Sequence, residues 1–133
     1  MKVAEIMETD VKTVSGEMTV AEAVVVLADE HVQGVPVVDS KGLMVGVLST
    51  SDILEAAAEC GSTEDRDKLF ERTMVNELMT PRPKTIDPDA DVKEAAQQLL
   101  YLEIHRLFVE YDEQLVGVIS QSDIVRAVAT AKI

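Results

Sequence analysis

A short pattern near the start of the chain returns in its second half, and this internal repeat limits the possible folds more than any other feature. The segment Val3–Met7 recurs 72 positions later as Val75–Met79, and the same offset carries Thr13-Val14 onto Thr85-Ile86. Repetition at such a period indicates that one supersecondary unit is built twice. Further matches at this offset pair Val20 with Val92, Ala23 with Ala95 and Leu27 with Leu99.

The later part of each copy matches at an offset of 71, which implies that the second copy has lost one residue. With this offset Gly46–Ile53 falls on Gly117–Ile124, and Pro36–Asp39 falls on Leu107–Glu110. Because the matches keep one order along the chain, we interpret them as a tandem duplication and expect equivalent structures in the two halves.

Hydrophobic spacing predicts the same series of elements in each copy: a helical turn, an extended piece, a helix, two strands and a closing helix. Thr19-x-x-Glu22 and Asp91-x-x-Glu94 have the spacing of capping boxes and predict where the longer helices begin. The elements expected in the first copy are a turn ending at Met7, an extended piece at Thr13-Val14, a helix from Thr19 to about His31, strands Val35–Val38 and Met44–Leu48, and a helix from Ser49 to about Ala58. Those of the second copy are a turn ending at Met79, an extended piece at Thr85-Ile86, a helix from Asp91 to about Glu103, strands Leu107–Glu110 and Leu115–Ile119, and a helix after Ser120.

These elements predict an α/β (α+β) fold of two tandem βαββα repeats with pseudo-two-fold symmetry and two separate sheets. We place the first repeat at residues 1–60 and the second at 74–133, with the polar segment 61–73 as a linker that Leu69-Phe70 anchors to the fold. A repeat of about sixty residues buries too little surface for a stable core of its own, so the two should pack together. We also expect Val3–Met7 to pack on the half formed by the other copy.

The charge balance argues against polyanionic partners. The chain holds 25 acidic residues against 12 Lys and Arg, a formal net charge of -13, so nucleic acid and anionic membranes would be repelled on average. Cys60 is the only cysteine, which excludes an internal disulfide and fits a reducing cytosol. The start at Met1–Glu5 has no apolar signal-peptide core, and the apolar stretch Val20–Ala28 is too short to span a bilayer. We expect a soluble, cytoplasmic protein with no nucleic-acid or membrane partner.

The repeated motif with the most chemical content is Gly-x-x-Ser-x-x-Asp, at Gly46-Ser49-Asp52 and Gly117-Ser120-Asp123. In each copy it marks a strand that passes into a helix, so a hydroxyl, free backbone N–H groups and a carboxylate meet at a helix N-terminus, which attracts phosphate. The carboxylate can also accept two hydrogen bonds from a ribose diol. A purely structural interpretation stays open, because Ser-x-x-Asp is close to a capping box.

The whole ordered set of motifs resembles the cystathionine beta-synthase (CBS) domain, and the tandem pair resembles a Bateman module. The resemblance covers nearly the whole chain. It is carried in the first copy by Val3-x-x-Ile6-Met7, Thr13-Val14, Val35–Asp39 and Gly46–Ile53, and in the second by Met79-Thr80-Pro81, Thr85-Ile86, His105–Val109 and Gly117–Ile124.

In that family paired domains form clefts that often bind AMP, ADP, ATP or S-adenosylmethionine, so the resemblance implies a regulatory sensor of an adenosyl ligand. It implies that Asp52 and Asp123 hold the ribose, and that Ser49 and Ser120 lie near the ribose or the phosphate. The other positions that the resemblance places at the ligand are Thr13, Val14, Thr85 and Ile86 through backbone groups, and Gly34, Val35, His105 and Arg106 before the strands.

Two departures between the copies bear on this expectation. Gly34-Val35 stands where the second copy has the basic pair His105-Arg106, so the two sites should not be equivalent. Leu107 stands where the family usually has proline, and we expect that change to affect packing only. The resemblance also implies a homodimer joined through helices and a regulated partner protein of unknown identity.

The competing hypothesis is an interaction module that dimerises without binding a ligand. An enzyme is not expected, because no residues assemble a base, a nucleophile and an oxyanion site. His31 and His105 are the only histidines, and no cysteine joins them at the spacing of a metal site. Asp87–Asp91 lacks the glycine and distal glutamate of a calcium loop. We therefore expect neither a metal nor a resident cofactor.

Overall fold

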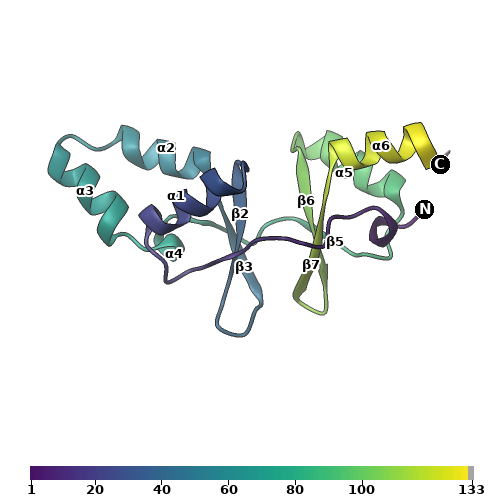
Figure 1. Ribbon diagram of the computed structural model, residues 1–133, viewed down its shortest axis with the longest axis horizontal. Helices are drawn as coiled ribbons and strands as arrows, with labels where there is room; N and C mark the ends of the chain where they lie inside the picture. Colours follow the sequence, from purple (N-terminus) through teal and green to yellow (C-terminus); the bar gives the residue numbers. More distant parts are fainter. Residues whose placement is uncertain (132–133) are drawn as a thin grey trace. The chain divides into compact units, whose positions relative to one another are not determined.

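The computed structural model describes residues 1–131; the last two residues of the predicted second repeat lie outside the described part. The chain forms two compact units. Unit I is Lys12–Pro83, and unit II joins Met1–Val11 to Lys84–Ile133. Each unit has its own sheet, as Figure 1 shows, so the expected mixed α/β fold with two separate sheets is confirmed.

Unit I contains a four-stranded sheet in the order β1-β2-β3-β4. The strands are β1 (Val14–Ser15), β2 (Gly34–Val38), β3 (Met44–Ser49) and β4 (Thr80–Pro81). β1 runs parallel to β2, whereas β2–β3 and β3–β4 are antiparallel. The β-branched residues of β2 and β3 suit a pleated, buried surface.

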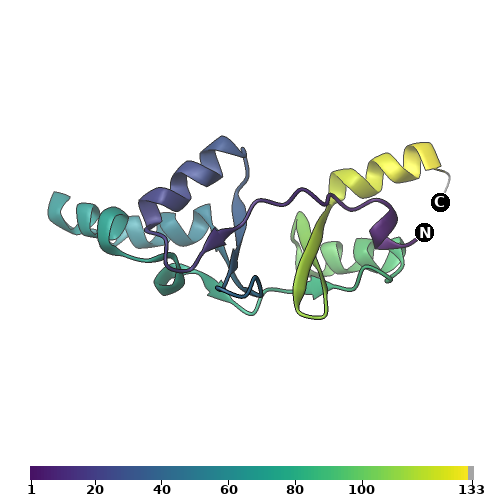
Figure 2. The same cartoon turned by 60° about the horizontal axis from the view of Figure 1, so that its bottom comes forward.

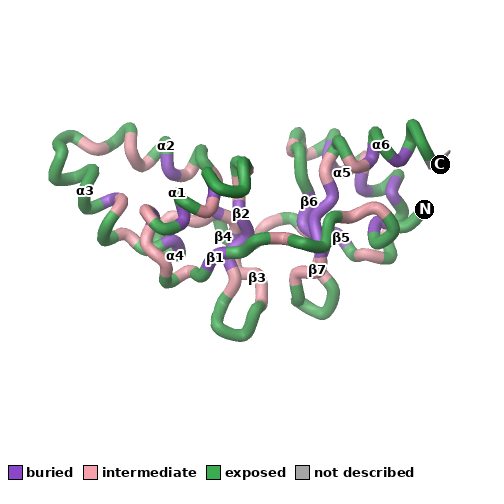
Figure 3. Tube along the Cα trace, in the orientation of Figure 1, coloured by how far each residue is buried: buried purple, intermediate pink, exposed green. Residues whose placement is uncertain are grey.

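The helices of unit I are α1 (Val20–Asp29), α2 (Thr50–Ala58), α3 (Thr63–Arg72) and the short α4 (Val75–Leu78). α1 buries Val20, Ala23 and Leu27, which recur at helical spacing and so form one apolar face. They share a core with strand residues such as Val37 and Leu48. In Figure 3 the buried positions gather in the strands and on the inward faces of the helices.

Unit II has a three-stranded sheet in the order β5-β6-β7, formed by β5 (Thr85–Ile86), β6 (Arg106–Tyr111) and β7 (Gln114–Ser120). Its helices are α5 (Val92–Leu102) and α6 (Gln121–Ala131), preceded by the single turn η1 (Val3–Glu5). Val92, Leu99 and Ile124 of the helices pack in one core with Leu107, Val109 and Ile119 of the sheet. This core is built from the same kinds of helix and strand positions as the core of unit I.

The opening segment of each sequence repeat packs in the unit that holds most of the other repeat. Val3 is fully buried in the core of unit II, where its N–H donates to the Ala90 carbonyl at 2.9 Å. Val75, its match in the second repeat, is fully buried in the core of unit I. The expected packing of Val3–Met7 is thus confirmed, and Figure 2 shows the N-terminal turn beside the start of the green helix α5.

The sequence-predicted linker 61–73 is largely helical. α3 starts at a Ser62 cap, whose Oγ accepts a hydrogen bond from the Asp65 N–H at 3.1 Å. Leu69 is buried and Phe70 packs against the core of unit I, so this pair does anchor the segment. The repeat boundaries themselves stay a prediction.

The two predicted capping boxes have different outcomes. Thr19 caps α1 through the Glu22 N–H, and Glu22 accepts from the Thr19 N–H in return, as expected. Asp91 instead accepts from the Lys93 N–H at 2.8 Å, so the predicted box with Glu94 is wrong. An aspartate caps through its own short side chain, which reaches the second amide of the helix as readily as the third.

The register of the hairpins corrects the alignment of the two repeats. Val35 lies opposite Leu48 in unit I, and Leu107 lies opposite Ile119 in unit II, so Leu107 matches Val35 and not Pro36. The offset stays at 72 through β2 and β6, and the lost residue falls in the β6–β7 turn. The structural match of Pro36 is Phe108, and the match of Arg106 is Gly34. A turn tolerates a deletion, whereas a one-residue slip in a strand would turn its buried side chains outward.

Candidate functional site

The first Gly-x-x-Ser-x-x-Asp motif lies where β3 passes into α2. The Asp52 N–H donates to Ser49 Oγ at 3.1 Å, and the Ser49 N–H donates to Asp52 Oδ2 at 2.9 Å. Both residues are half-buried. Ser49 is extended, so the chain turns from strand to helix at this residue. We call this junction site I.

The second motif lies where β7 passes into α6 and repeats this geometry. The Asp123 N–H donates to Ser120 Oγ at 3.1 Å, and the Ser120 N–H donates to Asp123 Oδ2 at 2.9 Å. We call this junction site II. The capping bonds expected from the structural interpretation are therefore present in both copies. They occupy one carboxylate oxygen of each aspartate and leave Oδ1 for other partners.

The partner of Oδ1 differs between the sites. At site I the Thr80 hydroxyl of β4 donates to Asp52 Oδ1 at 3.2 Å. At site II Arg126, one turn later on α6, lies with its Nη2 3.5 Å from Asp123 Oδ1. Sequence analysis did not assign a role to either residue. The Asp-x-x-Arg spacing on a helix could have indicated Arg126, but the contact with Thr80 spans 28 positions and has no local signal.

The strand opposite each serine also differs. Gly34 of β2 lies across from Ser49, whereas the exposed Arg106 of β6 lies across from Ser120. Directly paired residues have Cβ atoms about 5 Å apart, so the Arg106 side chain starts next to the motif. The neighbouring His105 is exposed, and its carbonyl accepts from the Gln121 N–H at 3.0 Å.

The remaining residues that sequence analysis placed at the ligand divide by burial. Val14, Val35 and Ile86 are buried in the cores, so only their backbone groups are available to a ligand. Thr13 is exposed and Thr85 is half-buried. The role of these segments in ligand binding stays a prediction.

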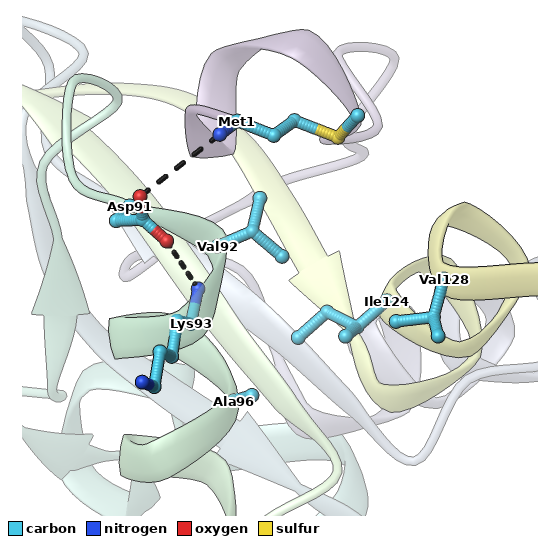
Figure 4. Close-up of a pocket in the computed structure, with 7 residues that line it drawn as sticks. All are labelled: Met1, Asp91, Val92, Lys93, Ala96, Ile124 and Val128. Atoms are coloured by element: carbon cyan, nitrogen blue, oxygen red, sulfur yellow. Dashed lines mark hydrogen bonds and ion pairs between the residues drawn. The ribbon is translucent and has the colours of Figure 1, made fainter. Parts of the chain in front are cut away.

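Figure 4 shows a separate, mainly apolar pocket of about 470 Å³ in unit II. Val92 and Ala96 of α5 face Ile124 and Val128 of α6 across it, and the amino group of Met1 lies 3.9 Å from Asp91 at its rim. Neither Ser120 nor Asp123 lines this pocket. It is therefore a groove between two helices and not part of site II.

Within residues 1–131 no group of three or more His, Cys, Asp or Glu side chains is placed to hold a metal ion. The same range contains no helix long and apolar enough to cross a bilayer.

The profile of the CBS domain matches residues 3–59 and 75–130, which is most of the chain. The chain belongs to the CBS domain family. This CBS domain protein is similar to the chloroplastic CBS domain-containing protein CBSX1 of Arabidopsis thaliana, with 31% identity over an alignment of 144 positions. The alignment covers 92% of the chain and 61% of CBSX1. The chain thus spans less than two thirds of that relative.

Solved structures of CBS proteins share the fold. The crystal structure of CBSX2 in complex with AMP matches with a TM-score of 0.83 and 28% identity, covering 99% of this chain and 98% of that one. AcuB from Vibrio cholerae matches with a TM-score of 0.83 and 27% identity, covering 99% and 93%. The resemblance stated from the motifs is therefore confirmed.

Proposed function

We propose that this CBS domain protein is a regulatory module that binds an adenosyl ligand at sites I and II and signals its presence to a partner protein. The ligands that fit are AMP, ADP, ATP or S-adenosylmethionine. The observation that carries the proposal is the state of the two aspartates: each is fixed through Oδ2 by a serine N–H and holds Oδ1 among polar groups.

The chemistry of a ribose matches this arrangement. A carboxylate accepts hydrogen bonds from neighbouring hydroxyls, and such charge-assisted bonds are stronger than neutral ones. The first turn of α2 or α6 adds free N–H groups and the positive end of a helix dipole, which favour a phosphate. The backbone at Thr13-Val14 and Thr85-Ile86 supplies donors and acceptors for an adenine edge.

The comparison with CBSX2 supports the choice of ligand, because the solved complex of that relative contains AMP. A regulatory role without catalysis is the function we propose, since the serine hydroxyl and one aspartate oxygen of each site are used in helix capping. No base and nucleophile are placed together in either of them. That a partner protein receives the signal is likewise proposed.

Isothermal titration of the full chain with AMP, ATP, adenosine and S-adenosylmethionine tests the proposal, with GMP as the control for the base. Asp52→Asn and Asp123→Asn should each weaken binding about tenfold at their own site, because a neutral amide cannot replace the charged acceptor. Asp65→Asn is the matched control, since Asp65 lies in the first turn of α3 behind the Ser62 cap and belongs to neither Gly-x-x-Ser-x-x-Asp motif. Absence of binding by every adenosyl compound would overturn the proposal.

A second candidate function is an interaction module without a ligand. Large apolar side chains on the helices are exposed: Val25 and Leu54 in unit I, and Leu100, Tyr101 and Val125 in unit II. Exposed apolar groups concentrated on one kind of element favour a protein contact. This function would stand if the titrations show no adenosyl ligand while the chain forms a stable dimer.

A further inference from the structure

We propose that sites I and II take adenosyl ligands of opposite charge character, and this inference rests on the proposed function. Site II takes the phosphorylated ligand, a nucleoside phosphate. Site I takes an uncharged or cationic adenosyl ligand. The assignment comes from side chains at matched positions around two junctions whose backbone geometry is the same.

The first difference lies one helical turn after each aspartate. Site II has Arg126 there, with its guanidinium 3.5 Å from Asp123 Oδ1 and its side chain 63% exposed. The matched position of α2 is Glu55, which is exposed and of opposite charge. A guanidinium presents five donors, so Arg126 can hold Asp123 and still offer donors to a phosphate. Glu55 would repel the same phosphate.

The second difference lies on the strand across from each serine, where site II has Arg106 and site I has Gly34. A Cβ added at Gly34 would meet its nearest atoms, Val47 Cγ1 and the Leu48 carbonyl oxygen, at 3.6 and 3.8 Å. These are ordinary van der Waals distances, so packing does not require glycine here. A side chain would therefore fit at position 34, but site I has no charged group there.

Two matched pairs act in the other direction, because Glu8 and Asp10 stand where unit I has Thr80 and Arg82. Glu8 pairs with Val118 in unit II as Thr80 pairs with Val47 in unit I, so site II has an extra carboxylate at its edge. Two placed guanidinium groups, rather than a net charge, distinguish site II: Arg126 lies 3.5 Å from Asp123 Oδ1, and Arg106 lies across from Ser120. The matched positions of site I hold Glu55 and Gly34, so site I has no arginine at either of them. In a chain of net charge -13 a phosphate needs such placed donors.

The same contacts suggest how each site receives its ligand. At site II a ribose diol would share Asp123 Oδ1 with Arg126, and the remaining N–H groups of Arg126 would donate to the phosphate. At site I the Thr80 hydroxyl is a neutral partner of Asp52 Oδ1, and the carboxylates of Asp52 and Glu55 favour a ligand such as a sulfonium or a nucleoside.

Titrations with AMP and adenosine on proteins in which one of the two sites is weakened test the inference. Asp52→Asn leaves site II in use, and this protein should keep its affinity for AMP. Asp123→Asn leaves site I in use, and this protein should bind AMP at least tenfold more weakly than it binds adenosine. The assignment would be overturned if the Asp52→Asn protein lost its affinity for AMP and the Asp123→Asn protein bound AMP more tightly than adenosine.

The arginines are tested directly in the Asp52→Asn background. Arg106→Gln and Arg126→Gln should each lower AMP affinity about tenfold, because each removes a charge-assisted bond to phosphate, and adenosine affinity should change less than twofold. Arg72→Gln, an exposed arginine of α3, is the control. Glu55→Arg in the Asp123→Asn background should raise AMP affinity at site I.

The outcomes separate this inference from the proposed function. If no adenosyl compound binds the unmodified protein, the proposed function fails. If AMP binds but its affinity relative to adenosine is the same in the Arg106→Gln and Arg126→Gln proteins, the charge assignment fails and the proposed function stands.

Discussion

Asp123 has two roles at the residue scale, because one carboxylate oxygen caps α6 and the other faces Arg126. Asp123→Ala should lower the free energy of unfolding by about 0.5–2 kcal/mol through loss of the cap. Asp123→Asn keeps an oxygen that can accept from the Ser120 N–H, so it should cost less stability. Both should lose about tenfold in adenosyl affinity. Urea melts beside calorimetric titrations measure the two effects separately.

Ser62→Ala is the control for that experiment, since it removes the equivalent cap of α3. It should destabilise the protein by a similar amount and leave ligand affinity unchanged. If Asp123→Ala reduced stability and left affinity at its original value, the aspartate would be a helix cap and nothing more.

Gly46 and Gly117 are required by close backbone approaches. A Cβ at Gly46 would lie 2.8 Å from the Thr80 carbonyl oxygen, and one at Gly117 would lie 2.8 Å from that of Glu8. Gly46→Ala should therefore push β4 from β3 and lower the free energy of unfolding by about 1–3 kcal/mol, with Gly117→Ala similar. Gly61→Ala, where the nearest atom is at 3.8 Å, should be nearly neutral in the same thermal melts. Equal effects at all three positions would contradict this explanation.

Among the elements, the β6–β7 hairpin stores backbone strain in its two-residue turn. Tyr111 pairs with Gln114, and the residues between them, Asp112 and Glu113, have φ of 51° and 66°. A turn with two positive φ values favours Asn-Gly, because side chains with a Cβ resist that conformation. Replacing Asp112-Glu113 by Asn-Gly should raise the free energy of unfolding by about 1 kcal/mol. A fall in the melting temperature would contradict the turn assignment.

The opening segments of the repeats should stabilise the units in which they pack. Val3→Ala leaves a cavity in the core of unit II and should cost about 2 kcal/mol, and Val75→Ala should do the same in unit I. Hydrogen exchange can locate the effect, because amides report the opening of their own cooperative region. We expect Val3→Ala to lower protection in α5 and β6, and Val75→Ala to lower it in α1 and β2. The reverse pattern would contradict the exchange of segments.

At the scale of the whole molecule, the exposed apolar side chains on the helices predict a homodimer. Leu100 and Val125 are 74% and 67% exposed and line one shallow depression between α5 and α6. A two-fold dimer would cover such a patch with the same patch of a second copy. Leu100→Glu and Val125→Glu should shift the protein to monomer in sedimentation at micromolar concentration. Glu94→Gln, at an exposed position of α5, is the control, and a monomeric unmodified protein would contradict the prediction.

The sequence alone predicted the duplication, most of the elements in their order, the Thr19 capping box and the CBS family, but not helix α3 or strand β4. The family follows from the resemblance of the ordered motifs. The elements and the cap follow from local spacing, because helix caps, hydrophobic periodicity and turn residues act over a few positions. The Ser-x-x-Asp junctions could be located for the same reason. Their role in ligand binding stays a prediction, as do the dimer and the cytoplasmic location.

Only the tertiary structure showed the strand register and the contacts between residues far apart in the sequence. The match of Arg106 with Gly34 follows from strand register, since a deletion is absorbed in a turn and cannot be absorbed in a buried strand. Thr80 reaches Asp52 because β4 pairs with β3, and nothing near either residue in the chain indicates that contact. Identical motifs at the two junctions therefore have different surroundings, which are set by packing between segments far apart in sequence.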